Sequence, residues 1–271
     1  MTTLIAFSAA DSRGPAALYL ASDSRISWGA NRDWDAGRKV FNCHVEPHAF
    51  GYCGDVVFPA LLISQLVELI DAQSIFAQDE GFEERDAKVL AVLQSSFGLR
   101  RNTPNVDFSL LHAARQGDST RSEFFISRIS YSVSSRSWSR ELLSVPKSGS
   151  ALIIKLGSGA SQFERHVRIW QMSAIGGTSR AIFGAFCAAL DAGQDIGSGG
   201  APQLVGIYRV GAAKAIGTVH DGVRYLCGLP VDSSFSLTQL EWRDELFQRI
   251  DGSTLQLMDG AQVHAKPKGV V

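Results

Sequence analysis

The sequence predicts an α+β fold in which helices lie outside packed β-sheets, in one domain over residues 1–271. The expected elements follow one another as strands, two helices, strands, two helices and strands, which suits sheets covered by helices. The composition is that of a globular protein, since 45% of the 271 residues are hydrophobic and 20% are charged. A chain of this length can bury a large core. No internal repeat or low-complexity linker indicates a domain boundary.

The first part of the chain consists of short strands and turns. Residues 2–7 (TTLIAF) and 17–22 (ALYLAS) are rich in β-branched and apolar side chains. The sequence DSRGP at residues 11–15 has turn chemistry, so the two strands form a hairpin. The polar, glycine-containing segment 27–37 predicts a loop. Two more short strands are expected, at residues 39–43 and 49–53.

The middle and the end of the chain alternate between helical and strand patterns. Apolar residues recur at helical spacing in residues 59–72 and 87–98, which predicts two amphipathic helices. The strands expected next, as an antiparallel meander, are residues 107–114, 122–131, 137–145 and 151–156. The remaining predictions are helices at 162–172 and 179–192, strands at 203–210 and 215–220, a short helix at 241–250 and a loose end at 266–271.

Charge and cysteine content exclude several classes of function. The formal net charge is −1 and no block of like charges occurs, so we expect no nucleic-acid partner. No apolar run is long enough to cross a bilayer, so we expect no membrane partner. None of the four cysteines forms a CxxC pair, and we expect no metal and no cofactor. The N-terminus lacks the features of a signal peptide, which favours a cytoplasmic protein with reduced thiols.

Thr2 is a candidate nucleophile. It directly follows Met1, and methionine aminopeptidase generally removes Met before a small residue such as threonine. A threonine hydroxyl needs a base to take its proton, and an N-terminal threonine carries its own α-amine, with an unperturbed pKa of about 7.7–8.0. Most threonines near a terminus simply belong to frayed ends. The residue is therefore only suggestive by itself.

Two charged residues lie at the ends of expected strands: Asp23 follows the second strand, and Lys39 precedes the third. The common roles of such residues are a turn aspartate and a solvated lysine. A buried lysine beside the Thr2 hydroxyl would lower the pKa of that hydroxyl, and it would need an aspartate as its partner. The pair can form only if the two strand ends meet.

Two glycine-rich segments could line a site. Gly157-Ser158-Gly159 lies between an expected strand and an expected helix, and it lacks the patterns of dinucleotide loops, P-loops and serine-hydrolase elbows. The second segment, residues 195–200 (DIGSGG), follows an expected helix. A plain turn and a glycine-rich helix stop are the alternative interpretations.

Taken in order, these segments resemble the proteasome β-subunit family and its bacterial relative HslV. The resemblance covers about residues 2–220. The matching motifs are Thr2-Thr3, Ala21-Ser22-Asp23, Ser27-Trp28-Gly29, Arg38-Lys39-Val40, the corner Gly51-Tyr52-Cys53-Gly54-Asp55, Gly157-Ser158-Gly159, and Asp195 with Ser198 and Gly199. The sequence departs from the family in a longer first hairpin at residues 9–15, an inserted hairpin near 117–149 and a C-terminal extension after residue 220.

The resemblance implies the four-layer αββα sandwich of the N-terminal-nucleophile (Ntn) hydrolases, and it implies a role for each matching residue. Thr2 would be the nucleophile, supported by Asp23 and Lys39, and Gly54 would stabilise the oxyanion. Strict counting places that last role on Cys53, but close backbone approach favours glycine. Ser158, Asp195 and Ser198 would contact the α-amine. Ser27 and Gly29 would bind the substrate.

The function that the resemblance implies is a threonine-type endopeptidase acting on peptides or unfolded proteins. It would work inside a homo-oligomeric ring, with an AAA+ unfoldase as a candidate partner. One alternative is an Ntn amidase for small amides, although such enzymes usually use Cys or Ser as the nucleophile. Another is a structural ring subunit, which the complete set of site residues argues against. No feature supports a non-enzymatic binding module.

Overall fold

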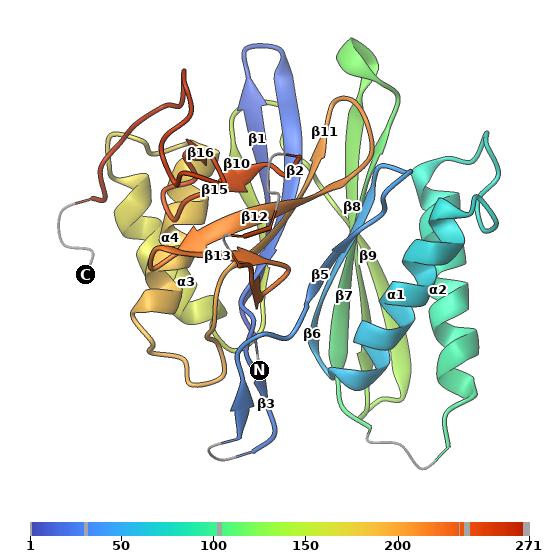
Figure 1. The fold of residues 1–271 in the computed structure, drawn as a ribbon. Helices are drawn as coiled ribbons and strands as arrows, with labels where there is room; N and C mark the ends of the chain where they lie inside the picture. Colours follow the sequence, from blue (N-terminus) through green and yellow to red (C-terminus); the bar gives the residue numbers. More distant parts are fainter. Residues whose placement is uncertain (1, 30–31, 102–104, 233, 236–238, 268–271) are drawn as a thin grey trace.

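The computed structural model describes residues 2–29, 32–101, 105–232, 234–235 and 239–267 (Figure 1). These residues form a mixed α/β structure with a nine-stranded sheet, a five-stranded sheet, a two-stranded hairpin and four α-helices. Met1 lies outside the described residues, as do the last four residues of the predicted loose end. No helix in the described part of the chain is long and apolar enough to cross a membrane.

The nine-stranded sheet is built around the N-terminal hairpin. Its main path runs in the order β10-β1-β2-β11-β12-β13-β14, and β15 joins it beside β12 and pairs in turn with β16. β1 therefore lies inside the sheet, paired antiparallel with both β2 and β10. The bounds are β1 Leu4–Asp11, β2 Gly14–Ser22, β10 Ala151–Leu156, β11 Gln203–Tyr208, β12 Lys214–His220, β13 Val223–Leu226, β14 Leu229–Pro230, β15 Trp242–Arg243 and β16 Arg249–Ile250.

The five-stranded sheet runs in sequence order from β5 to β9. The two-stranded hairpin β3–β4 projects at the end of the molecule opposite the β1–β2 turn (Figure 1). The strand bounds are β3 Ile26–Ser27, β4 Asp33–Trp34, β5 Val40–Asn42, β6 His48–Gly54, β7 Phe108–Gln116, β8 Glu123–Ser132 and β9 Ser137–Leu143. The helices are α1 Val57–Asp71, α2 Phe82–Gly98, α3 Ala160–Gln171 and α4 Ser179–Asp191, with a 3₁₀ turn at Ser119–Arg121.

The two large sheets face each other, and helices cover the outer face of each (Figure 1). Alternation along β1 explains this packing, because successive strand residues point to opposite faces. Leu4 and Ala6 belong to the core between the sheets, together with Leu111 of β7. Phe7, in contrast, packs with α4 on the outer face. A third core lies between α1, α2 and the outer face of the five-stranded sheet.

Most of the predicted elements are confirmed, with shifted ends. The first hairpin, the four helices and the strands at 39–43, 49–53, 203–210 and 215–220 are present. α2 begins five residues earlier than predicted, at Phe82, where the Glu84 carboxylate accepts a hydrogen bond from the N–H of Gly81. The predicted loop at 27–37 contains the β3–β4 hairpin. Segment 117–149 contains β8 and β9, and the residues after 220 add β13 to β16.

Two predictions are wrong. Residues 151–156 do not continue the meander, because β10 crosses to the other sheet and pairs with β1. Residues 241–250 form β15 and β16 instead of a short helix. There, Trp242 is buried and β15 adds to β12, while Phe247 takes a φ of +63°, which no α-helix allows. Tertiary pairing thus overrides the helical spacing of the apolar residues.

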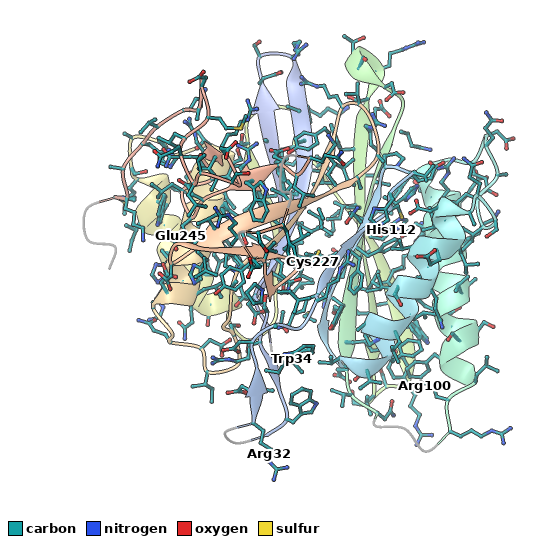
Figure 2. All side chains as sticks on the ribbon, in the orientation of Figure 1. Arg32, Trp34, Arg100, His112, Cys227 and Glu245 are labelled. Atoms are coloured by element: carbon teal, nitrogen blue, oxygen red, sulfur yellow. The ribbon has the colours of Figure 1, made fainter. Side chains whose placement is uncertain are left out.

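A cluster of ionisable side chains fastens the C-terminal extension to α4. His220 Nδ1 lies 3.0 Å from a Glu245 oxygen, and His220 Nε2 lies 3.7 Å from oxygens of both Asp191 and Asp221. Lys266 Nζ lies 3.6 Å from Glu245 and 3.9 Å from Asp191. Glu245, which lies between β15 and β16, is labelled in Figure 2. The nearby Glu245 carboxylate raises the pKa of His220, and the His220 ring lowers the pKa of Glu245 to about 2.

We expect the stability from this cluster to depend on pH. Because the folded-state pKa of His220 is raised, its contribution is complete below the unfolded value near 6.5, and it is lost as pH rises through the folded value. His220→Gln should therefore lower the free energy of unfolding by about 1–2 kcal/mol at pH 6 and by much less at pH 9. Urea unfolding at the two pH values checks this. A loss of equal size at both would contradict it.

Candidate active site

The site begins where the first hairpin ends. Thr2 and Thr3 precede β1, Asp23 follows β2, and the pairing of Leu4 with Ser22 brings the two strand ends together. The Thr3 N–H donates to Asp23 Oδ1 at 2.9 Å, and the Asp23 N–H donates back to the Thr3 carbonyl at 3.2 Å. Thr2 is 2% exposed. The N-terminal residues are thus fixed by the sheet.

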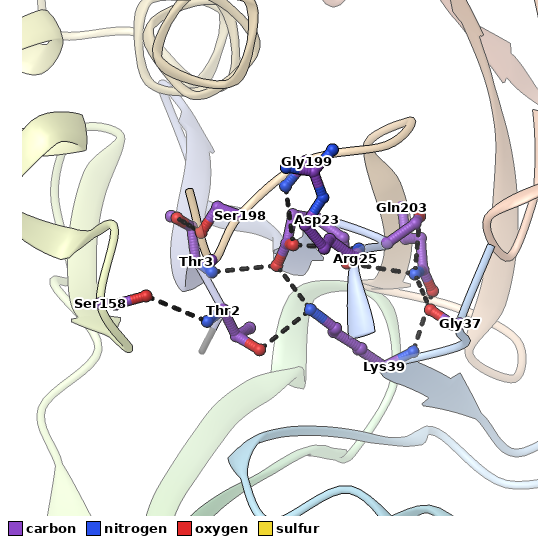
Figure 3. Close-up of polar contacts among 12 residues, drawn as sticks. Thr2, Thr3, Asp23, Arg25, Gly37, Lys39, Ser158, Ser198, Gly199 and Gln203 are labelled. Carbon is purple, nitrogen blue, oxygen red and sulfur yellow. Dashed lines mark hydrogen bonds and ion pairs between the residues drawn. The ribbon is translucent and has the colours of Figure 1, made fainter. Parts of the chain in front are cut away.

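Lys39, which precedes β5 in the opposite sheet, points at Thr2 (Figure 3). Its Nζ donates to Thr2 Oγ1 at 2.9 Å and to Asp23 Oδ1 at 2.9 Å. The side chains of Lys39 and Asp23 are both fully buried. The predicted meeting of these two strand ends is therefore observed, with the threonine hydroxyl in contact with the lysine.

Burial changes the acidity of this ion pair. It lowers the pKa of Lys39, against the opposing charge of Asp23. Burial also raises the pKa of Asp23, against Lys39 and the backbone N–H groups that bind its carboxylate. Those N–H groups belong to Thr3, Arg25 and Gly199. The ammonium group is thus held in place beside the Thr2 hydroxyl but is more easily deprotonated than a solvated lysine.

A hydrogen-bonded network of Ser158, Asp195 and Ser198 begins at the Thr2 nitrogen. The Thr2 N–H donates to Ser158 Oγ at 3.3 Å, and Ser158 donates to Asp195 Oδ2 at 2.7 Å. Ser198 donates to the same carboxylate oxygen at 2.7 Å. Because the Ser198 hydroxyl proton is donated to Asp195, Ser198 Oγ accepts a hydrogen bond from Thr3 Oγ1 at 2.7 Å. The Thr2 nitrogen thus faces a chain of hydroxyls that ends on a carboxylate.

Gly54 lines a cavity of about 660 Å³ together with Thr2 and Ser158. The Tyr52 N–H donates to the Lys39 carbonyl on the β5 side. Because alternate N–H groups of a strand point the same way, the Gly54 N–H points to the β5 side of the strand, whereas that of Cys53 points to β7. Gly54 has a φ of +99°, and a Cβ there would lie 2.2 Å from the Asp107 carbonyl oxygen. Only glycine fits this corner.

Ser27 and Gly29 are not among the residues that line this cavity. They lie in the β3–β4 hairpin, where Ser27 pairs with Asp33. Figure 2 shows Arg32, between the two strands of this hairpin, at the lower end of the molecule. Their role in substrate binding stays a prediction.

Three comparisons with known proteins were made, of sequence families, curated proteins and solved structures. No protein-family model matches the chain, and no curated protein matches it. Among solved structures, the chain is similar to eukaryotic HslV from Trypanosoma brucei, at 13% sequence identity and a TM-score of 0.47. This similarity covers 76% of the chain and 99% of the HslV chain.

Sequence reasoning missed Gln203, and it named Gly157 only as part of a glycine-rich segment without a role of its own. The side chain of Gln203 accepts from the Lys39 N–H at 3.0 Å and donates to the Gly37 carbonyl at 2.7 Å, which fixes the backbone under Lys39. Gly157 has a φ of +90°, and a Cβ there would lie 1.9 Å from the Thr2 carbonyl oxygen. A polar residue at the start of an otherwise apolar strand was the available signal for Gln203.

Proposed function

We propose that this protein is a threonine-type peptidase whose nucleophile is Thr2, made N-terminal by removal of Met1. The observation that supports this most directly is the double contact of Lys39 Nζ, at 2.9 Å from both Thr2 Oγ1 and Asp23 Oδ1. Burying a lysine completely costs folding free energy unless its charge is paired, so such a residue is more often functional than one on the surface. The hydroxyls around the Thr2 nitrogen support a chemical role for that nitrogen as well.

The reaction is acyl transfer. The neutral α-amine of Thr2 takes the hydroxyl proton, Oγ1 attacks the peptide carbonyl, and the Gly54 N–H stabilises the oxyanion. The amine then gives its proton to the leaving nitrogen as the C–N bond breaks. Water attacks the resulting ester and restores the hydroxyl. Lys39 keeps a positive charge beside Oγ1, while Ser158, Asp195 and Ser198 orient the amine.

A peptide substrate is favoured over a small amide. The cavity beside Thr2 extends along β7, β8 and the β8–β9 turn, and its volume of about 660 Å³ exceeds what a small amide fills. We propose endopeptidase action on peptides or unfolded proteins in the cytoplasm. We also propose that the two facing sheets, with helices outside, are the four-layer αββα sandwich of the Ntn hydrolases.

Mass spectrometry of the purified protein tests this function. We expect an intact mass without Met1, and one adduct per chain after treatment with a peptide epoxyketone, which reacts with both the hydroxyl and the amine of an N-terminal threonine. Peptide mapping should place that adduct on Thr2. Adduct formation at another residue, or none at all with Met1 absent, would overturn the proposal. Cleavage of amides of single amino acids but of no peptide would favour the amidase.

We further propose that the protein assembles into a homo-oligomeric ring that encloses the Thr2 sites. Helix α1 exposes Val57, Leu61 and Leu69 (59%, 63% and 42% exposed) on the outside of the molecule, where a neighbouring subunit could cover them. An AAA+ unfoldase is needed only if the substrates are folded.

Light scattering checks the assembly. We expect a particle of several subunits, and we expect Leu61→Glu to shift it toward the 29.3 kDa monomer because a charge would be buried at the contact. Met172→Glu is the matched control, since Met172 is 82% exposed and follows α3 on the other side of the molecule. A stable monomer at micromolar concentration would refute assembly as an intrinsic property.

A further inference from the structure

One wall of the cavity beside Thr2 is unusually polar for the inner face of a sheet. Along β8, Phe124 and Ile126 face the core between the sheets. Because strand residues alternate, Arg128, Ser130 and Ser132 continue this same face, and all three line the cavity. The inner face of β8 thus changes from apolar to polar as it approaches Thr2.

The neighbouring strands extend this polar wall. Ser109 of β7 is hydrogen-bonded to Ser130 at 2.8 Å. Ser135, in the β8–β9 turn, and Ser137 and Ser139 of β9 also line the cavity. Ser135, Ser137 and Ser139 are exposed, but Ser109 is buried and Ser130 is half-buried. Hydroxyls at those two places give up the stability that apolar side chains would add there, which indicates that they bind a polar group beside the nucleophile.

Arg128 supplies the charge of this wall. Its Nε donates to Ser130 Oγ at 3.1 Å, and its Nη2 lies 3.5 Å from Ser109 Oγ. Within the described residues, no carboxylate oxygen lies within 4.0 Å of the Arg128 guanidinium, although Glu141 of β9 is directly opposite Arg128 in the strand register. Nearby Arg140, in contrast, is paired with Asp86. The one carboxylate that lines the cavity, Asp107, accepts a hydrogen bond from the Val133 N–H at 2.6 Å.

We propose that this wall binds an acidic side chain of the peptide substrate, with Arg128 pairing to the carboxylate and the serine hydroxyls donating to it. This inference rests on the proposed peptidase function. A guanidinium presents several N–H donors in a fixed plane and suits a carboxylate better than any neutral group. Its place on the cavity wall that holds Thr2 makes Arg128 a specificity-determining residue, which selects peptides with Glu or Asp near the bond that is cut.

Internally quenched peptides with amidated C-termini test this inference, so that no terminal carboxylate can imitate a side chain. Glu is placed in turn at each position around the scissile bond, with Gln at the same position as its neutral match. At one position, we expect kcat/KM to be about tenfold higher for Glu than for Gln. Arg128→Gln should bring this ratio close to one. Arg136→Gln, which removes the same charge from the exposed β8–β9 turn, should leave it unchanged.

A binding measurement separates this inference from the function on which it rests. Calorimetry with the Thr2→Ala variant should show tighter binding of the Glu peptide than of the Gln peptide, and added Arg128→Gln should abolish the difference. A Thr2 adduct together with equal cleavage and equal binding of both peptides would overturn the acidic preference alone. Preferential binding of the Glu peptide without any Thr2 chemistry would overturn the peptidase function and leave the acidic site standing.

Discussion

Thr2→Ala is expected to lower peptide hydrolysis by more than about a thousandfold while the protein stays folded, because no other group in the proposed mechanism can attack the carbonyl. The change removes the hydrogen bond of Lys39 Nζ to Thr2 Oγ1 and leaves the ion pair of Lys39 with Asp23 intact. The free energy of unfolding should therefore fall by only about 1 kcal/mol. Steady-state cleavage of a quenched peptide and thermal unfolding measure the two effects.

Two further proteins make this test specific. Thr2→Ser keeps a hydroxyl next to the α-amine and should retain measurable activity. An N-terminal extension that is not removed keeps the Thr2 hydroxyl but turns its amine into an amide, so it should inactivate the enzyme as completely as alanine does. Wild-type activity in the alanine variant or in the extended protein would show that catalysis takes place elsewhere.

The sequence predicted the parts of this molecule that depend on local patterns and on their order. The hairpin at residues 2–22 follows from two β-rich runs around a turn, and it brings Asp23 beside Thr3. The order of the motifs also placed Lys39 near Thr2, and its Nζ lies 2.9 Å from Thr2 Oγ1. The N–H groups of Cys53 and Gly54 point to opposite sides of β6, and that of Cys53 points to β7, which supports Gly54 over Cys53 at the cavity corner. The chemical roles of these residues are what the experiments have to decide.

Other features depend on contacts between distant parts of the chain, and local patterns do not contain them. The run at 151–156 was recognisable as a strand, but its pairing with β1 is set by the packing of the whole sheet. Trp242, Leu246 and Ile250 recur at helical spacing, and yet Trp242 and Ile250 lie in short strands. Arg128 looked like an ordinary strand residue, because only the fold shows that its side of β8 borders the cavity.

Lys39→Ala is expected to reduce activity by about a hundredfold to a thousandfold, and Arg38→Ala by only a few-fold. Lys39 Nζ contacts the Thr2 hydroxyl, whereas Arg38 lies over the Phe41 ring at 4.5 Å and donates to the Val40 carbonyl. Adjacent residues of an extended chain point to opposite sides, so the two charges act in different places. Cleavage of one quenched peptide by both variants, compared with wild type, measures the difference.

Loss of Lys39 also leaves Asp23 buried without its counter-charge, which should cost about 3–5 kcal/mol of stability and could by itself lower activity. The double variant Asp23→Asn/Lys39→Met removes both charges at similar volume and should recover part of that stability, because the amide keeps only one of the two oxygens that accept backbone N–H groups. If Lys39 acts on the Thr2 hydroxyl, this double variant stays as inactive as Lys39→Ala even though it is well folded. Recovery of activity along with stability in the double variant would mean that Lys39 only stabilises the structure. Equal losses of activity for Arg38→Ala and Lys39→Ala at matched stability would mean that the contact of Lys39 with Thr2 has no part in catalysis.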